Sequence, residues 1–314
     1  MKKMFVLLVI VALALSAAGN AVAADSPRQF NLPIKVLYNA RQVEFPDAKP
    51  KMDNNRVLVP VRFVAEKLGA KITYKNQLVT IRKDDKVIEL PIGSNAVKVN
   101  GEELVLDTKA MAEQGRTYVP LRFVSDALGE KVEWDAVNRF VWIGHKDVPR
   151  IEDVIEPVDF APFKHYYTGP RANDYIRNSN NLNPELFGTE HVTAFVLRET
   201  DFPLVISNHI VFRFDRVVID GKEYIRHTSD DRASLGLALF FLQTGQPLKT
   251  RGGIASMTEV LNGGIRAYYN TVVYSADRWI YDIQDPSSLK LKDIEYIGIA
   301  SDYGSAVIME NFLK

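Results

Sequence analysis

The sequence predicts an α+β protein, in which antiparallel sheets curl around short helices in two repeats and a β-rich region with one or two helices follows. Two observations carry this prediction. A pattern of strand, proline, helix and hairpin occurs twice, in residues 56–74 and 116–134, and alternating apolar residues recur throughout the second half. The 314 residues are enough for about two domains.

The first residues have the pattern of a secretory signal peptide. Lys2 and Lys3 precede an apolar run, residues 4–15, and Ala21-Val22-Ala23 forms a small-residue cleavage site. The alternative is a membrane anchor, but the run is shorter than the roughly 20 apolar residues that span a bilayer. We therefore expect residues 1–23 to be removed. The protein is then secreted, extracellular or associated with the cell envelope, and has no integral membrane span after cleavage.

Composition excludes several classes of function. The chain has 39 basic and 39 acidic residues, whereas a general nucleic-acid binder needs an excess of Lys and Arg. It has no cysteine, so disulfides and cysteine-type zinc sites are excluded. No phosphate-binding loop, nucleophile elbow or zinc-protease motif occurs. We predict no cofactor and no nucleic-acid partner.

Each of the two similar segments predicts a strand that ends at a proline, then a two-turn helix, then a hairpin. Proline suits the first turn of a helix, and a glycine follows the last apolar residue of each helix. The apolar stripes are Val61, Val64 and Leu68 in the first copy and Leu121, Val124 and Leu128 in the second. A preceding strand pair turns at residues 39–40, and another turns at the Asn100-Gly101 hairpin signal. We expect one domain, residues 30–147, in which each helix is buried against its own small sheet.

Four residues of this domain are candidates for ligand binding. Arg62 and Arg122 occupy matching places two residues after the prolines, which suggests a paired anion site. The alternative, which we favour, is that their stems pack over the helices while each guanidinium pairs with a carboxylate or carbonyl. Trp134 and Trp142 can form a sugar-stacking platform with Phe140, but aromatic residues in strands mostly pack in the core.

The two segments "LVPVRFVAEKLGAKITY" and "YVPLRFVSDALGEKVEWDAVNRFVWI" resemble the copper amine oxidase N-terminal domain-like family over about residues 34–145. The resemblance implies a stalk-type module that carries neither copper nor catalytic residues and serves as a wall-associated or interaction module. The oxidase itself would need an Asn-Tyr-Asp/Glu motif and a His-x-His pair. Neither occurs, and the five histidines are far apart, which argues against amine oxidase activity.

The second half divides into a linker and a β-rich domain. Residues 148–185 carry prolines, charges and an Asn- and Gly-rich stretch, which predicts an irregular segment. Residues 186–314 alternate as strands, and a sandwich is one arrangement open to them. Within them, residues 233–245 predict a buried helix, residues 256–264 a short capped helix and residues 278–285 a strand.

Few residues of the second half are candidates for a metal, acid/base or carbohydrate-binding site. His209 and His227 can face each other on neighbouring strands to form a metal or acid/base site, although we favour two histidines that simply pack. A run of aromatic residues can line a carbohydrate face or fill a core, and its members are Tyr268, Tyr269, Tyr274, Trp279 and Tyr281.

The sequence leaves enzymatic activity open and favours a non-catalytic role. We expect the N-terminal module to bind the cell envelope or a partner, and the β-rich domain to bind a ligand such as a glycan. The partner would be a cell-wall or surface polymer, or a protein. The alternatives are an exported hydrolase of wall or polysaccharide, with its site in residues 150–314, and a structural subunit of a surface assembly.

Overall fold

The computed structural model describes residues 27–177, 185, 187–230 and 236–314. The predicted signal peptide, residues 1–23, therefore lies outside the described residues. Contacts divide the chain into two units, residues 1–30 and 31–314, and all helices and strands named below belong to the second unit. The predicted boundary near residue 148 stays a prediction. Within the described ranges, each helix is too short or too polar to cross a lipid bilayer.

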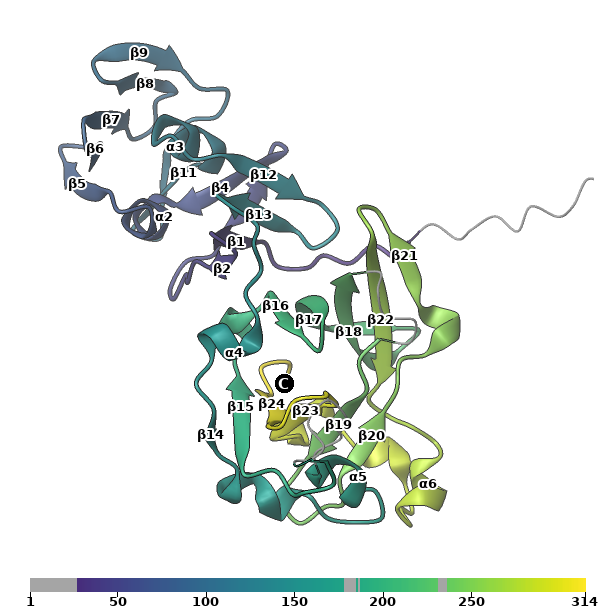
Figure 1. Cartoon of the computed structure of the whole chain (residues 1–314). Helices are drawn as coiled ribbons and strands as arrows, with labels where there is room; N and C mark the ends of the chain where they lie inside the picture. The colour runs from purple at the N-terminus through teal and green to yellow at the C-terminus, as the bar shows by residue number, and fades with distance from the viewer. Residues whose placement is uncertain (1–26, 178–184, 186, 231–235) are drawn as a thin grey trace, which may run out of the picture. The chain divides into compact units, whose positions relative to one another are not determined.

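Residues 35–143 form three sheets and two short helices (Figure 1). The first sheet has the order β12-β13-β1-β2, with strands Val132–Asp135, Phe140–Ile143, Lys35–Tyr38 and Arg41–Gln42. The second has the order β10-β11-β4-β3, with strands Met111–Glu113, Arg116–Pro120, Arg56–Pro60 and Lys51–Asp53. The third runs from β5 to β9, with strands Lys71–Lys75, Leu78–Lys83, Lys86–Pro91, Ala96–Val99 and Glu102–Val105.

The two helices begin directly after the prolines, as the sequence predicts. α2 is Val61–Lys67 and follows Pro60, and α3 is Leu121–Ala127 and follows Pro120. The predicted apolar stripes are buried and join a single hydrophobic core. Burial of these stripes stabilises helices that are too short to persist alone in water.

The two segments share their sheets, which differs from the expectation that each helix has its own. β4 pairs with β11, so that Val59 lies opposite Val119. β1, the first strand of residues 35–143, pairs in parallel with β13, the last strand of that range. α2 contacts β11, and α3 contacts β4. Each helix therefore buries its stripe partly against the other segment. A sequence pattern indicates which face of a helix is apolar but not which strand covers it.

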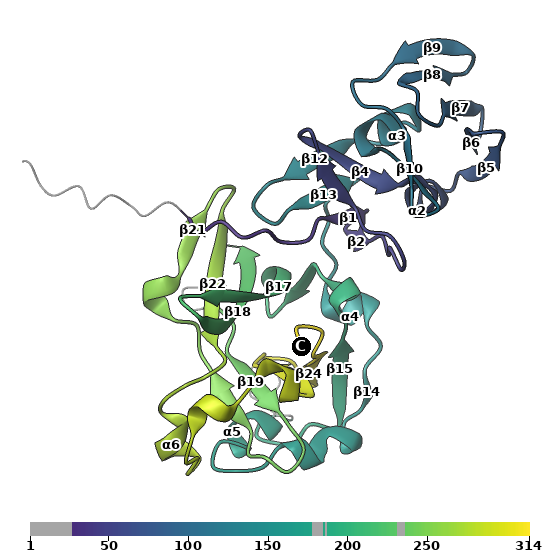
Figure 2. The same cartoon turned by 180° about the vertical axis from the view of Figure 1, so that it is seen from behind.

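Two larger sheets contain most strands of the second half (Figure 2). The order β14-β15-β24-β23-β19-β20 comprises Val158–Asp159, Thr193–Leu197, Ala306–Glu310, Tyr296–Ile299, Leu239–Leu242 and Lys249–Arg251. The order β16-β17-β18-β22-β21 comprises Leu204–Ile206, His209–Ile219, Lys222–Asp230, Ile265–Thr271 and Glu259–Leu261. Both sheets contribute to one hydrophobic core, for example Phe214 and Ile225 from the second and Phe241 and Ile297 from the first.

Short helical turns connect these strands. The α-helical turns are α4 Ile151–Val154, α5 Asn173–Ile176 and α6 Asp277–Ile280, and the 3-10 turns are η1 Ala161–Tyr166, η2 Glu199–Asp201, η3 Ala255–Met257, η4 Pro286–Ser288 and η5 Leu291–Asp293. The β-rich second half and the few short helices confirm the predicted α+β class.

Three predicted elements are wrong. The described part of the predicted helix at 233–245 contains strand β19, which pairs with β20 and β23 in the sheet interior. The predicted helix at 256–264 is a 3-10 turn followed by strand β21, and the predicted strand at 278–285 contains part of α6. A segment that is apolar all round fits a buried central strand as well as a buried helix, and here pairing partners decide the outcome.

Candidate functional site

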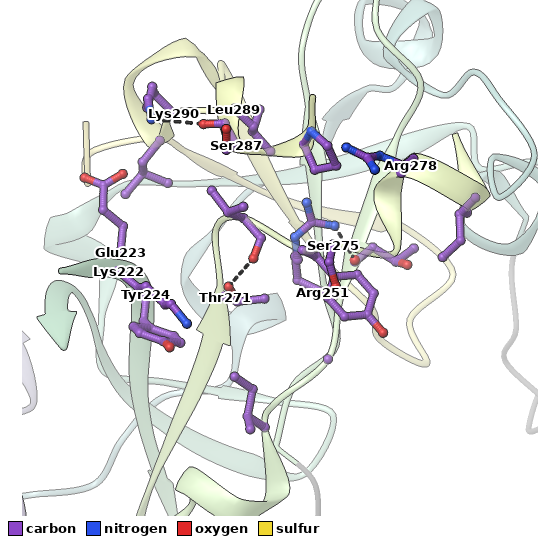
Figure 3. A pocket seen from close by; sticks show the side chains of 18 of the residues that line it. Lys222, Glu223, Tyr224, Arg251, Thr271, Ser275, Arg278, Ser287, Leu289 and Lys290 are labelled. Carbon is purple, nitrogen blue, oxygen red and sulfur yellow. Dashed lines mark hydrogen bonds between the residues drawn. The ribbon is translucent and has the colours of Figure 1, made fainter. Parts of the chain in front are cut away.

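A groove of about 1820 Å³ lies in the second half of the chain. Four segments form most of its wall: the β17–β18 hairpin, β20 with the glycines after it, residues 271–280 and residues 285–292. Figure 3 shows Lys222, Arg278 and Lys290 around it, each from a different segment. Its volume exceeds the roughly 300–1,000 Å³ of most small-molecule pockets, so it can hold several units of a polymer.

The β17–β18 hairpin forms one side of the groove. Asp220 and Gly221 have φ values of 49° and 73°, the positive angles of a tight hairpin turn that the Asp-Gly pair predicts. The turn places Lys222 and Glu223 at the start of β18, opposite Ile219 and Val218. Arg216 on β17 forms an ion pair with Glu223 across the hairpin.

Arg251 on β20 holds two segments of the wall together, its own and residues 271–280. Its guanidinium donates to both carboxylate oxygens of Asp277 at 3.1 and 2.5 Å, and to the Val272 carbonyl at 3.2 and 3.1 Å. The side chains of Arg251 and Asp277 are each 1% exposed. The guanidinium also lies 5.0 Å from the centre of the Phe241 ring and 5.8 Å from that of Tyr274. Figure 1 shows α6 near β20, where this pair connects them.

Aromatic side chains are exposed along the segment that Arg251 fixes. Trp279 in α6 is 82% exposed and Tyr274 is 45% exposed, and both line the groove. In the same short helix Asp277 is buried, so one side chain anchors the turn while another projects outward. Trp279 and Tyr274 together give this wall an exposed apolar face with polar tips, which a ligand in the groove could cover.

The structure divides the aromatic run that the sequence singled out. Tyr268 and Tyr269 are fully buried in β22, and Tyr281 is buried with its hydroxyl accepting a hydrogen bond from the Thr250 amide at 3.0 Å. Tyr274 and Trp279 remain at the groove. Three members of the run therefore lie in the core, and two are exposed at the groove.

The candidates in residues 30–147 do not gather at one place. Arg62 is exposed, lies 5.2 Å from the centre of the Tyr74 ring and lines a cavity of about 110 Å³ with Arg116, whereas Arg122 is exposed and does not line that cavity. Trp142 is buried against Phe140, and Trp134 is 38% exposed.

The two candidate histidines have different surroundings. His227 lies opposite Phe214 in the β17–β18 ladder and is fully buried, with its ring stacked on Tyr268 at 5.0 Å between centres. His209 lies near Asp230 instead, with Nδ1 3.6 Å from Oδ1. In the described part of the chain, no three His, Cys, Asp or Glu side chains are grouped so that they could hold a metal ion.

Burial of His227 predicts a pH-dependent stability. Desolvation, with a smaller contribution from nearby Arg226, lowers the pKa of His227 to about 3, although a hydrogen bond with Asn270 opposes the shift. An unfolded histidine titrates near 6.5, so below that pH the unfolded chain binds a proton that the folded chain rejects. Stability is therefore complete above about pH 6.5 and decreases toward pH 3, by at most about 1.4 kcal/mol per pH unit.

Urea denaturation at pH 7, 6 and 5 measures this effect. His227→Gln is expected to show a shallower decrease in stability than the wild type, because carboxylates that titrate are common to both proteins. The control is His145→Gln, since the His145 side chain is 53% exposed and its replacement should leave the pH dependence unchanged. Equal slopes for wild type and His227→Gln would contradict the prediction.

The comparisons with known proteins bear on the first half of the chain. Residues 37–143 match the family model of the copper amine oxidase N-terminal domain. This confirms the resemblance seen in the two similar segments and covers about a third of the chain. No curated protein matches the chain. The groove lies outside the copper amine oxidase N-terminal domain, because its lining residues all follow residue 143.

Proposed function

We propose that the protein is an exported, non-catalytic binding protein whose groove in the second half binds a polysaccharide. The copper amine oxidase N-terminal domain would bind the cell envelope or a partner. Trp279 carries the proposal, because it is 82% exposed on the wall of a groove that is large enough for several sugar units. An exposed indole offers a flat apolar face to the C–H groups of a sugar ring, and Tyr274 extends that face.

The carboxylates of the groove favour binding over hydrolysis. A glycosidase needs two carboxyl groups, one of them with a raised pKa so that it can donate a proton. Glu223 is held in an ion pair by Arg216. Asp285 accepts hydrogen bonds from the amide and hydroxyl of Ser287, which lower the pKa of its carboxyl group. Asp285 therefore lacks the environment of a general acid, and Glu223 is engaged by Arg216.

Binding to purified cell-wall sacculi tests the proposal. Trp279→Ala is expected to reduce the retained fraction at limiting sacculus concentration, with an apparent affinity about tenfold lower, because a central aromatic contact often contributes more than 1 kcal/mol. Phe187→Ala is the matched control, since Phe187 is 57% exposed and does not line the groove. Far-ultraviolet circular dichroism verifies that both variants are folded.

The results of this binding experiment show whether the groove binds the wall, whether the protein binds polysaccharide at all, and whether it hydrolyses it. If Trp279→Ala is retained like the wild type and the control variant, the groove is not the wall-binding site. If the wild type is not retained and shows no affinity for a panel of soluble polysaccharides, the proposed function is wrong. Release of reducing sugars from sacculi would instead support the exported hydrolase.

A further inference from the structure

We infer that the polysaccharide bound in this groove carries anionic groups. This inference rests on the proposed function and specifies its ligand. Seven Lys and Arg side chains line the groove against two carboxylates, whereas the whole chain has 39 basic and 39 acidic residues. A balanced protein that concentrates cations in one groove creates a local positive potential there, which attracts anionic ligands.

Part of this charge is neutralised within the protein. Arg251 is paired with Asp277, Arg216 forms an ion pair with Glu223, and Arg171 lies 2.9 Å from Asp174. Guanidinium groups held in such pairs are positioned by the fold and have little charge left for a ligand. These three arginines shape the wall.

Four cations of the wall have no ion pair with a carboxylate among the described residues, and they are Lys222, Arg278, Lys290 and Lys292. All four are exposed. Arg278 donates to the Gln284 carbonyl at 3.2 Å, and Lys290 donates to the Ser287 carbonyl at 3.0 Å, and neither contact cancels a charge. Asp285 is the remaining carboxylate of the wall; Arg278 and Lys290 both help to lower its pKa, after the hydrogen bonds from Ser287.

The placement of these cations fits a polymer better than a single anion. Lys222 comes from the β17–β18 turn, Arg278 from α6, and Lys290 from the segment between η4 and η5, so the charges surround the groove (Figure 3). A single anion would be bound by donors that converge on one point. Cations distributed around a large groove instead match charges repeated along a chain.

The aromatic wall distinguishes a sugar polymer from other polyanions. Tyr274 and Trp279 lie in the same segment as Arg278, so one stretch of wall offers both ring faces and a cation. An acidic sugar presents both complementary features in each unit, an apolar ring face and a charged group. An acidic polypeptide has the charge without the ring. The ligand that matches both features of the wall is an anionic sugar polymer, and its anionic group can be a carboxylate or a phosphate.

Two matched pairs of polysaccharides test the inference by affinity electrophoresis. Polygalacturonate is compared with its methyl ester, and phosphomannan with the same mannan after removal of phosphate. The wild type is expected to bind the anionic member of at least one pair about tenfold more tightly than its neutral counterpart. The pair that shows the difference identifies the anion. Binding should weaken as salt is raised, because exposed charges are screened.

Paired charge variants assign the effect to the groove. Lys222→Gln combined with Lys290→Gln is expected to remove most of the preference for the anionic polymer. The control combines Lys67→Gln with Lys75→Gln, which removes the same charge from exposed positions in the copper amine oxidase N-terminal domain, and should leave the preference unchanged.

Other outcomes overturn the inference. Equal affinity for charged and neutral polymers would refute it while leaving the proposed function intact if Trp279→Ala still weakens both. Poly-L-glutamate or a single-stranded oligodeoxynucleotide bound as tightly as the anionic polysaccharide would show a general polyanion site. No binding to any polysaccharide or to sacculi would refute the inference and the proposed function together.

Discussion

Replacing Asp277 by alanine is expected to lower the free energy of unfolding by about 3–5 kcal/mol, because it leaves a buried guanidinium without its carboxylate. The Arg251 and Asp277 side chains are each 1% exposed, and two hydrogen bonds join them. The same change should weaken polysaccharide binding. Arg251 also holds the Val272 carbonyl, and the segment that follows carries Tyr274 and Trp279.

Urea denaturation measures the change, and Asp174→Ala provides the matched control. Asp174 pairs with Arg171, which also lines the groove, but both side chains of that pair are about half exposed. An exposed pair contributes about 0–1 kcal/mol, so its loss should barely affect stability. A cost below 1 kcal/mol for Asp277→Ala would show that the buried pair does not anchor the wall.

A double replacement separates the penalty of an unpaired charge from the contribution of the pair. In Arg251→Met combined with Asp277→Leu, neither charge remains in the core. Apolar replacements of a buried ion pair are often neutral or stabilising, so this variant should be more stable than Asp277→Ala. It should still bind polysaccharide poorly, since the Val272 carbonyl loses both hydrogen bonds from Arg251.

Local sequence signals predicted the parts of the fold that depend on neighbouring residues. Asn100-Gly101 and Asp220-Gly221 form the expected hairpins because the positive φ angles of such turns suit these residues. α2 begins at Val61 and α3 at Leu121, immediately after their prolines. In each case, the physical cause lies within a few residues of the structure that it determines.

The failures concern choices that depend on distant partners. Residues 239–242 are apolar enough for a buried helix, but they form a strand because β20 and β23 flank them on both sides. The same reason explains why the sequence did not reveal the groove. Trp279 was a candidate, but Lys222 and Lys290 join it only because the sheet brings residues far apart in sequence to one place. The Asp-Gly turn beside Lys222 and the basic residues at 290 and 292 were the available signals.

Arg213 connects the two halves of the chain through buried hydrogen bonds. It is fully buried on β17, and its Nε and Nη2 donate to the Asp215 carboxylate at 2.8 and 2.5 Å. Its Nη1 donates to the carbonyls of Pro33 at 3.2 Å and Asn138 at 2.5 Å. One guanidinium therefore satisfies a buried carboxylate and two carbonyls about 75 and 180 residues away in sequence.

Arg213→Ala is expected to lower the free energy of unfolding by about 3–5 kcal/mol, because Asp215 stays buried and loses its direct pair with Arg213, while Arg226 remains at 3.5 Å. Asn138 would also lose a donor to its carbonyl, although its side chain keeps a 2.7 Å hydrogen bond from Thr228. Urea denaturation followed by fluorescence and by circular dichroism measures the loss. The control is Arg216→Ala, three residues along the same strand, since the Arg216 side chain is 49% exposed in its ion pair.

The shape of the unfolding curve then tests how the two halves depend on each other. If Arg213 joins them energetically, its loss should uncouple them, so that Arg213→Ala unfolds in two steps where the wild type unfolds in one. A single transition shifted to a lower urea concentration would mean that the two halves still unfold together and that Arg213 is not what couples them. A change below 1 kcal/mol, no larger than that of Arg216→Ala, would contradict the role of Arg213. A buried charge without its partner is costly. The buried charge of Arg213 lies where β17 meets residues 33 and 138, so its partners there belong to both halves of the chain.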